Sequence, residues 1–175
     1  MPPIESSVMS TPAGPLCLLV DDGVLIGAGF VAAPSELQAR LAAPDRSRPL
    51  HSVADLGAVT AALAAYLHGD LIALDRLPVR QPGTPHQHRL WEELRRVAPG
   101  TTVTYGDLAA RAGSPRAARA AGSACARNLV APVVPCHRVL HSDGTLGGYG
   151  YGLSAKRWLL DHERRHAGAG PLAAG

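Results

Sequence analysis

A cysteine, a histidine and an arginine stand side by side at Cys136, His137 and Arg138, directly after Pro135. A free thiol with a pKa near 8.5 is only about 3% thiolate at pH 7, so a cysteine nucleophile needs a base or a positive charge beside it. Adjacent side chains of an extended strand point to opposite faces. His137 can therefore serve Cys136 only if the chain turns there or a water molecule bridges them. These residue types permit thiol chemistry, although a Cys-His pair alone is weak evidence for it.

The two other cysteines, Cys17 and Cys125, lie far apart in the sequence and belong to no CxxC motif. An odd number of widely spaced cysteines predicts neither a disulfide framework nor a self-contained zinc site. We expect Cys17 and Cys125 to be structural, because most free thiols are core residues.

The composition is that of a folded protein, with 175 residues, 46% of them hydrophobic and 18% charged. This is enough apolar mass for one compact unit or two small lobes. No repeat or low-complexity segment is visible, and no apolar stretch is long enough to span a membrane. The first ten residues lack the basic start and apolar run of a signal peptide. We therefore expect a cytoplasmic protein without membrane contact.

Charge is distributed unevenly between the two halves of the chain. Residues 1–83 carry five cationic and eight acidic side chains, whereas residues 84–175 carry twelve cationic and six acidic ones. Nearly all of the cations are arginine, whose planar guanidinium suits phosphates and base edges. A basic second half favours nucleic-acid binding, but a GC-rich coding bias would enrich arginine as well.

The first 80 residues show strand and helix patterns in alternation. Apolar residues at 16–20 and 24–30 flank an Asp-Gly turn and predict two hairpin strands. Residues 35–43 predict a short helix, and a second helix starts at the Asp55 cap and stops at Gly69. A further strand is expected at 73–79. Residues 80–83 have the composition of a linker.

The pattern of residues from position 84 onward predicts helices. Thr84, Pro85 and Gln87 have the spacing of an N-cap, a first-turn proline and a capping-box partner. Thr104 can cap a shorter helix through residue 112, and Ser114-Pro115 can open another through residue 126. Two short helices joined by a tight turn in a basic region predict a helix-turn-helix. The second of these helices consists of small residues and arginines, which suits close approach to a partner but also tight packing on a neighbour.

The segment Pro135-Cys136-His137-Arg138-Val139, with Asn128 before it and Gly148-Tyr149 after it, resembles the active-site signature of the O6-alkylguanine-DNA alkyltransferases. The resemblance runs from about Thr84 to Glu163 and continues more weakly in Thr11 to Leu16. It implies an α/β lobe over residues 1–80 with a small antiparallel, ribonuclease-H-like sheet. It further implies a mainly α, winged-helix or helix-turn-helix-like domain over 84–166 that carries the cysteine, and a flexible tail over 167–175.

The resemblance also implies a reaction and its catalytic residues. Cys136 would attack the alkyl carbon on guanine O6 and keep the group as a thioether, so each molecule would react once. His137, oriented by Glu163 and acting through a water molecule, would draw off the thiol proton. Tyr105 would donate a proton or a hydrogen bond to the departing guanine. The amide of Asn128 would tie the turn at Cys136 to nearby backbone. No cofactor and no metal would be needed.

The partner implied is double-stranded DNA containing O6-alkylguanine, bound through its minor groove by a protein that is monomeric in solution. The target nucleotide would be rotated out of the stack, with Arg119 filling the vacated space. The implied DNA contacts are Arg119, Ser114, Arg127, Ala117, Ala118, Ala120 and Gly122. The implied substrate pocket consists of Pro135, Arg138, Tyr149, Gly150 and Tyr151.

Three positions depart from the family pattern, namely His86, Leu129 and Tyr151. We expect Tyr151 to narrow the pocket, so that methyl groups are preferred over benzyl-sized ones. The alternatives are a non-catalytic alkyltransferase-like protein that only binds lesions, a helix-turn-helix regulator and a cysteine hydrolase. The first characteristically lacks the cysteine, the second has no use for the thiol, and the third has no use for Arg119 on a helix of small residues.

Overall fold

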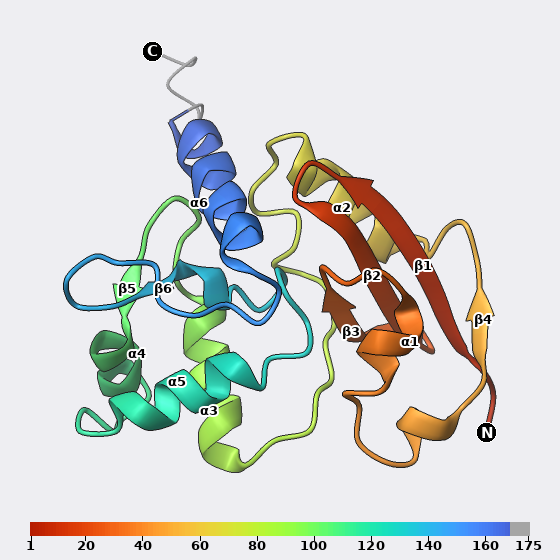
Figure 1. The fold of residues 1–175 in the computed structure, drawn as a ribbon, viewed down its shortest axis with the longest axis horizontal. Coiled ribbons are helices and arrows are strands. Elements are labelled where there is room, and N and C mark those ends of the chain that lie inside the picture. The colour runs from red at the N-terminus through yellow and green to blue at the C-terminus, as the bar shows by residue number, and fades with distance from the viewer. Residues whose placement is uncertain (169–175) are drawn as a thin grey trace.

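The computed structural model describes residues 1–168 and shows a sheet half followed by a helical half (Figure 1). The sheet half contains β1 (Ile4–Thr11), β2 (Gly14–Asp21), β3 (Val24–Gly29), α1 (Pro34–Gln38), η1 (Asp45–Ser47), β4 (Leu50–Ser52) and α2 (Ala58–Leu67). The helical half contains α3 (Pro85–Arg95), β5 (Val103–Thr104), α4 (Tyr105–Arg111), α5 (Ala118–Ala126), η2 (Cys136–Arg138), β6 (Val139–Leu140) and α6 (Leu153–Ala167). Most of the expected tail, residues 169–175, lies outside the described residues.

The sheet has the strand order β3-β2-β1-β4. The predicted hairpin is confirmed as β2 and β3, and its turn is built on Asp22 and Gly23, which both adopt positive φ angles. This conformation matches the twist of the flanking strands. The expectation of a purely antiparallel sheet is wrong at one edge, because β4 pairs parallel to β1. A parallel neighbour is possible there because the long segment with α1 and η1 returns the chain to the end of the sheet at which β1 begins.

Strand β2 is buried on both faces, which explains its continuous apolar run. Leu16, Leu18 and Val20 face the larger core, which includes residues of α2 and the helical half. The alternate residues Cys17 and Leu19 pack in a smaller cluster on the other face, with residues of α1 among its members. The period of two along the strand thus divides its side chains between two apolar layers.

The strand expected at residues 73–79 is not formed. The chain makes consecutive turns instead, and Leu71, Leu74 and Leu77 are all buried at a spacing of three. Three backbone bonds between residues i and i−3 hold these turns. Only Val79 pairs with the sheet, in an isolated parallel bridge to Leu25. The apolar period was therefore that of a turn series and not that of a strand.

The helical half begins as the sequence predicts. Thr84 accepts a hydrogen bond from the Gln87 amide at 3.2 Å, and the Gln87 side chain accepts one from the Thr84 amide at 2.9 Å. Thr104 and Asp107 form the same kind of box at the start of α4. Helix α5 packs against α4, as a helix-turn-helix requires. It begins only at Ala118, because the amide of Ala117 bonds to the Ser114 carbonyl and closes a separate turn over 114–117.

Other differences concern helix ends. The helix expected over 35–43 is the shorter α1, and the Gln38 side chain at its end donates to the carbonyls of Asp45 and Arg48.

None of the helices within residues 1–168 has the length and apolar character needed to cross a membrane.

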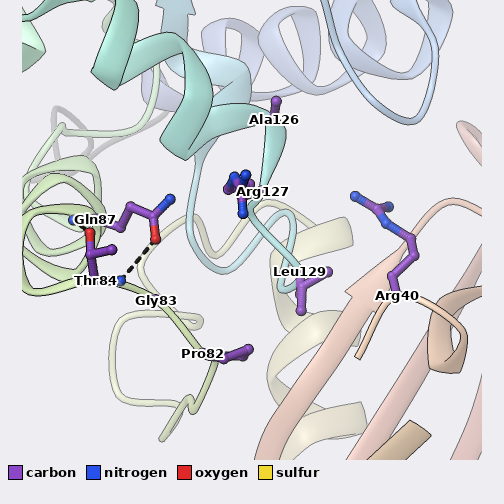
Figure 2. A pocket seen from close by; sticks show the side chains of 8 residues that line it. All are labelled: Arg40, Pro82, Gly83, Thr84, Gln87, Ala126, Arg127 and Leu129. Carbon is purple, nitrogen blue, oxygen red and sulfur yellow. Dashed lines mark hydrogen bonds between the residues drawn. The ribbon is translucent and has the colours of Figure 1, made fainter. Parts of the chain in front are cut away.

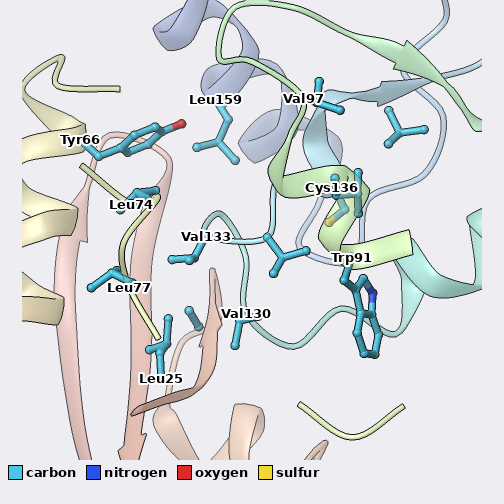
Figure 3. Close-up of a cluster of buried hydrophobic side chains, with 14 of the residues drawn as sticks. Leu25, Tyr66, Leu74, Leu77, Trp91, Val97, Val130, Val133, Cys136 and Leu159 are labelled. Carbon is cyan, nitrogen blue, oxygen red and sulfur yellow. The ribbon is translucent and has the colours of Figure 1, made fainter. Parts of the chain in front are cut away.

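One apolar core joins the two halves, as Figure 3 shows for residues of the sheet, the turn segment, α3, α6 and the chain around Cys136. The segment after α5 lies between the halves. Ala28 of β3 donates to the Leu129 carbonyl at 2.8 Å and accepts from the Ala131 amide at 3.0 Å. This segment therefore extends along the edge of the sheet just before it reaches Cys136.

The contribution of α2 to this core is testable at Val59, which is 2% exposed. Replacing Val59 with alanine removes two buried methyl groups and should lower the free energy of unfolding by about 2 kcal/mol. Ala61→Ser on the exposed face of the same helix is the matched control and should change it by less than about 0.5 kcal/mol. Urea denaturation measures both values, and equal stability of the two variants would contradict this packing.

Candidate active site around Cys136

The chain turns at Cys136, which meets the geometric condition for cooperation with His137. Residues 136–138 form a single 3₁₀ turn, in which the Arg138 amide donates to the Pro135 carbonyl at 3.0 Å. Cys136 is 6% exposed, and His137 is fully buried. The turn therefore directs Cys136 toward Asn128, and directs both His137 and Arg138 toward Glu163.

Asn128 holds the thiol of Cys136. Its side-chain nitrogen donates to Cys136 Sγ at 3.2 Å and to the Val134 carbonyl at 2.7 Å. Gln81 in turn donates to Asn128 Oδ1 at 3.2 Å and accepts from the Leu129 amide at 2.8 Å. Gln81 was not among the expected site residues, because a glutamine in a linker carries no signal in the sequence. The segment over residues 80–83 is thus a fixed part of the site.

Burial raises the pKa of the Cys136 thiol. The hydrogen bond from Asn128 and the charge of Lys156 act in the opposite direction and offset the effect of burial only in part. The resting side chain is therefore a thiol, and its reaction requires a group that accepts the proton.

Glu163 lies behind this turn and accepts hydrogen bonds on both carboxylate oxygens. Oε1 accepts from His137 Nε2 at 2.7 Å, from Arg138 Nη2 at 2.8 Å and from the Tyr66 hydroxyl at 2.8 Å. Oε2 accepts from Arg138 Nε at 2.9 Å and from the Gly100 amide at 3.3 Å. Burial alone would raise the pKa of Glu163, but the hydrogen bonds from His137 and Arg138 and the charge of Arg138 outweigh burial and lower it. Glu163 is thus a buried anion with matched donors.

The network fixes which nitrogen of His137 can accept a proton. Burial lowers the pKa of His137 despite the neighbouring Glu163, so the imidazole is neutral near pH 7. Its Nε2 faces the ionised carboxylate and carries the hydrogen. Nδ1 is then the basic nitrogen, and it is buried without a hydrogen-bond partner among residues 1–168.

A cavity of about 330 Å³ opens in front of Cys136. It is lined by Tyr105, Gly122, Cys125, Ala126, Cys136, Gly148, Tyr149 and Gly150. Burial raises the pKa of Tyr105, which keeps its phenol a hydrogen-bond donor at neutral pH. Cys125, expected to be only structural, forms part of this wall, whereas Cys17 is buried in the sheet and donates to the Val31 carbonyl at 3.3 Å.

Lys156 fixes the loop on one side of this cavity. The lysine is fully buried, and its Nζ donates to the carbonyls of Val139 at 2.8 Å and Gly148 at 3.4 Å, as well as to that of Leu146. Burial lowers its pKa. Lys156 was not an expected site residue, and its position among the apolar residues of α6 is the only signal that could have marked it.

A second cavity, of about 490 Å³, lies between the halves and does not include Cys136. Figure 2 shows Arg127 and Arg40 on its walls, together with Gln87 and Leu129. The larger size reflects an open surface groove. The smaller cavity is the candidate active site, because it contains the thiol.

Three residues expected in the pocket lie elsewhere. Arg138 points away from the cavity, toward Glu163 and the Val97 carbonyl, because a buried guanidinium needs these acceptors. Pro135 precedes the turn and is not part of the lining. Tyr151 packs over Gly29, where a Cβ would lie 2.4 Å from the tyrosine ring, and its ring is 5.1 Å from the Arg40 guanidinium. Tyr151 contacts the cavity wall at Tyr149, whose ring it meets edge-on at 5.6 Å.

The residues expected to contact DNA lie on α5 and directly before and after it. Arg119, Arg127 and Ala118 are exposed, and Ser114, Ala117, Ala120 and Gly122 are partly exposed. Gly122 also reaches the cavity, so this helix joins the outer surface to the thiol. Within residues 1–168, no three His, Cys, Asp or Glu side chains are grouped in a way that could hold a metal ion.

The lowered pKa of His137 predicts a loss of stability in mild acid. The ordinary value is 6.5, so below that pH the unfolded chain binds a proton that the folded protein excludes. Between about pH 7.5 and 5.5 this should cost about 1 kcal/mol of the free energy of unfolding. Urea denaturation at both pH values should show a smaller difference in His137→Gln than in the unsubstituted protein. An identical pH dependence in the two proteins would show that His137 titrates normally when folded.

The chain is similar to proteins of known name. Residues 85–165 match the family described as 6-O-methylguanine DNA methyltransferase, DNA binding domain. The methylated-DNA–protein-cysteine methyltransferase of Salmonella typhimurium is 45% identical over 112 residues, which are 64% of this chain and 66% of that protein, just under two thirds of its length. The Shigella flexneri protein of the same name is 37% identical over 158 residues, covering 89% of this chain and 92% of that protein.

Solved structures agree with these relatives. The crystal structure of the Mycobacterium tuberculosis O6-methylguanine methyltransferase has a TM-score of 0.78 and 30% identity, and covers 98% of this chain and 99% of its own. A structure of the M. tuberculosis protein in complex with DNA has a TM-score of 0.74 and 31% identity, over 93% of this chain and 94% of its own. The chain belongs to the family of methylated-DNA–protein-cysteine methyltransferases.

Proposed function

We propose that this protein repairs DNA by transferring the alkyl group of O6-alkylguanine, mainly methyl, to Cys136. The observation that carries the proposal is the Cys136 thiol at the wall of a cavity, with His137 and Glu163 directly behind it. The names of the relatives and the DNA complex of the M. tuberculosis protein support the same reaction. The presence of Cys136 argues against a lesion-binding protein without catalysis.

The chemistry follows from the geometry of the site. The bond between guanine O6 and the alkyl carbon breaks as the bond between Sγ and that carbon forms. The thiol proton passes through a water molecule to His137 Nδ1, and Glu163 stabilises the resulting imidazolium. Tyr105 donates its phenolic proton to the guanine, which leaves as a neutral base, and the proton on the His137 imidazolium returns to the phenolate through water. The thioether has no route back to the thiol, so each molecule acts once.

The surface of α5 supports minor-groove binding. Its small residues allow close approach of the helix to DNA, and Arg119 stands exposed among them to fill the space of a flipped nucleotide. Arg127 and Ser114 are placed to contact phosphates. We assign residues 1–80 to a ribonuclease-H-like lobe and 84–166 to a winged-helix-like DNA-binding domain. We infer a protein that is monomeric in solution and can cluster on DNA, and that is found in the cytoplasm and at the nucleoid while bound.

Mass spectrometry tests the transfer directly. Incubation with duplex DNA carrying one O6-methylguanine should add one methyl group per molecule to the peptide that contains Cys136. Cys136→Ser should gain nothing, whereas Cys125→Ser, altered in the same cavity wall, should still be methylated at Cys136. Tight lesion binding without any mass gain would instead indicate a non-catalytic protein.

Nucleotide flipping is tested at Arg119. Arg119→Ala should slow transfer from duplex DNA by about ten- to a hundredfold, because flipping costs a few kcal/mol and each 1.4 kcal/mol is a factor of ten. Transfer from the free base O6-methylguanine needs no flipping and should keep its rate. Arg116→Ala, a neighbouring exposed arginine, is the control for lost charge alone. Equal slowing on duplex and free base would contradict the role of Arg119 in flipping.

A further inference from the structure

Tyr66 reaches from the sheet half into the network behind Cys136. It lies near the end of α2 and is fully buried. Its hydroxyl donates to Glu163 Oε1 at 2.8 Å, across 97 positions of sequence. In Figure 3 the hydroxyl end of Tyr66 points toward Leu159 of α6, the helix that also carries Glu163. The carboxylate of the helical half is therefore held in part by the sheet half.

The oxygen that Tyr66 contacts is the one that holds His137. Oε1 accepts from three donors, namely Tyr66, His137 Nε2 and Arg138 Nη2, at 2.7–2.8 Å. Donors that share one oxygen divide its negative charge, so each weakens the hydrogen bonds of the others. The strength of the His137–Glu163 bond therefore depends on the Tyr66 hydroxyl.

The surroundings hold Tyr66 in this position. His162 Nε2 donates to the Tyr66 carbonyl at 2.8 Å, and the two rings meet edge-on at 5.2 Å. His162 directly precedes Glu163 on α6, so the backbone and the side chain of Tyr66 are tied to adjacent residues of one helix. Burial together with Glu163 raises the pKa of Tyr66 well above 10, so the phenol remains a donor throughout the neutral range.

We propose that Tyr66 is a positioning residue for alkyl transfer, whose hydroxyl sets how strongly Glu163 holds His137 and so makes the proton relay depend on the docked sheet half. The proposal rests on the proposed function, in which His137 accepts the thiol proton. Tyr66 does not touch the cavity and acts only through Glu163 and His137.

The expected direction follows from the charges around the relay. The titratable groups coupled to His137 or Glu163 are Arg138, Lys156, Tyr66, Tyr149 and His162. Tyr66→Phe removes one donor from Oε1 and leaves the others in place. The carboxylate then keeps more negative charge for His137 and favours the imidazolium, so the pKa of His137 rises. Less neutral imidazole is available in mild acid, and transfer slows there.

Single-turnover methyl transfer, measured between about pH 5 and 9, is the first test. In Tyr66→Phe the acid limb of the rate profile should move to higher pH by about 0.5 to 1 unit, slowing transfer below the limb about three- to tenfold. Rates well above the limb should stay within about twofold of the unsubstituted protein. Val59→Ala on the same helix, away from Glu163, is the control for lost stability and should not move the limb.

Nuclear magnetic resonance of the unreacted protein gives a second measurement that does not require turnover. The Nε2 proton of His137 should move downfield in Tyr66→Phe, because its bond to Glu163 strengthens, and should keep its position in Val59→Ala. An unchanged proton resonance together with an unchanged acid limb in folded Tyr66→Phe would overturn the role of Tyr66.

A third variant separates this inference from the function on which it rests. His137→Gln should abolish the acid limb and slow transfer. If His137→Gln reacts with the rate and profile of the unsubstituted protein, the proposed relay itself is wrong. If His137→Gln behaves as expected while Tyr66→Phe does not, the relay stands and only the role of Tyr66 is wrong.

Discussion

A carboxylate removed from water is the constraint around which this structure is organised. Glu163 is fully buried, and an unpaired charge in that position would be strongly destabilising. The protein meets this requirement with an arginine and a histidine from the turn at Cys136, a backbone amide from the segment before β5, and a phenol from α2. These three segments must therefore converge on α6, which carries Glu163, before His137 is oriented beside the thiol.

The shared core makes this convergence possible. The segment from Asn128 to Pro135 lies along the edge of β3 and ends at the turn that carries the thiol. Because apolar side chains of both halves pack around it, the thiol position is determined by tertiary packing and not by a local loop conformation. A mobile loop could not hold Asn128 within hydrogen-bonding distance of the sulfur while its oxygen accepts from Val130 and Gln81.

Local signals in the sequence predicted the parts of the fold that are determined locally. The Asp-Gly hairpin, the capping box at Thr84 and the N-cap at Thr104 are short-range patterns, and each is confirmed. The predicted strand at 73–79 is wrong because the buried leucines are spaced by three, which is the period of consecutive turns and not that of a strand. The parallel strand β4 gave no signal, since three residues with mostly exposed side chains show no periodicity.

The sequence likewise predicted some residues of the candidate site and missed others. Motif resemblance led to Cys136, His137, Asn128, Tyr105 and Glu163, and the structure brings these residues to one cavity and the network behind it. It did not lead to Tyr66, Gln81 or Lys156, which enter through contacts with residues far away in sequence. A buried tyrosine on a helix and a glutamine in a linker have no distinctive pattern, so only the fold shows what they touch.

The bond between Gln81 and Asn128 has a consequence for how such a chain can be divided or lengthened. Residues 80–83 connect the two halves, and the side chain of Gln81 in this segment also supports the Asn128 amide that holds the Cys136 thiol. Extra residues inserted between positions 80 and 84 would move Gln81 away from Asn128. If one half were exchanged for that of a distant relative, residues 80–83 would have to be kept with the helical half. Gln81 belongs to the active site because it supports Asn128.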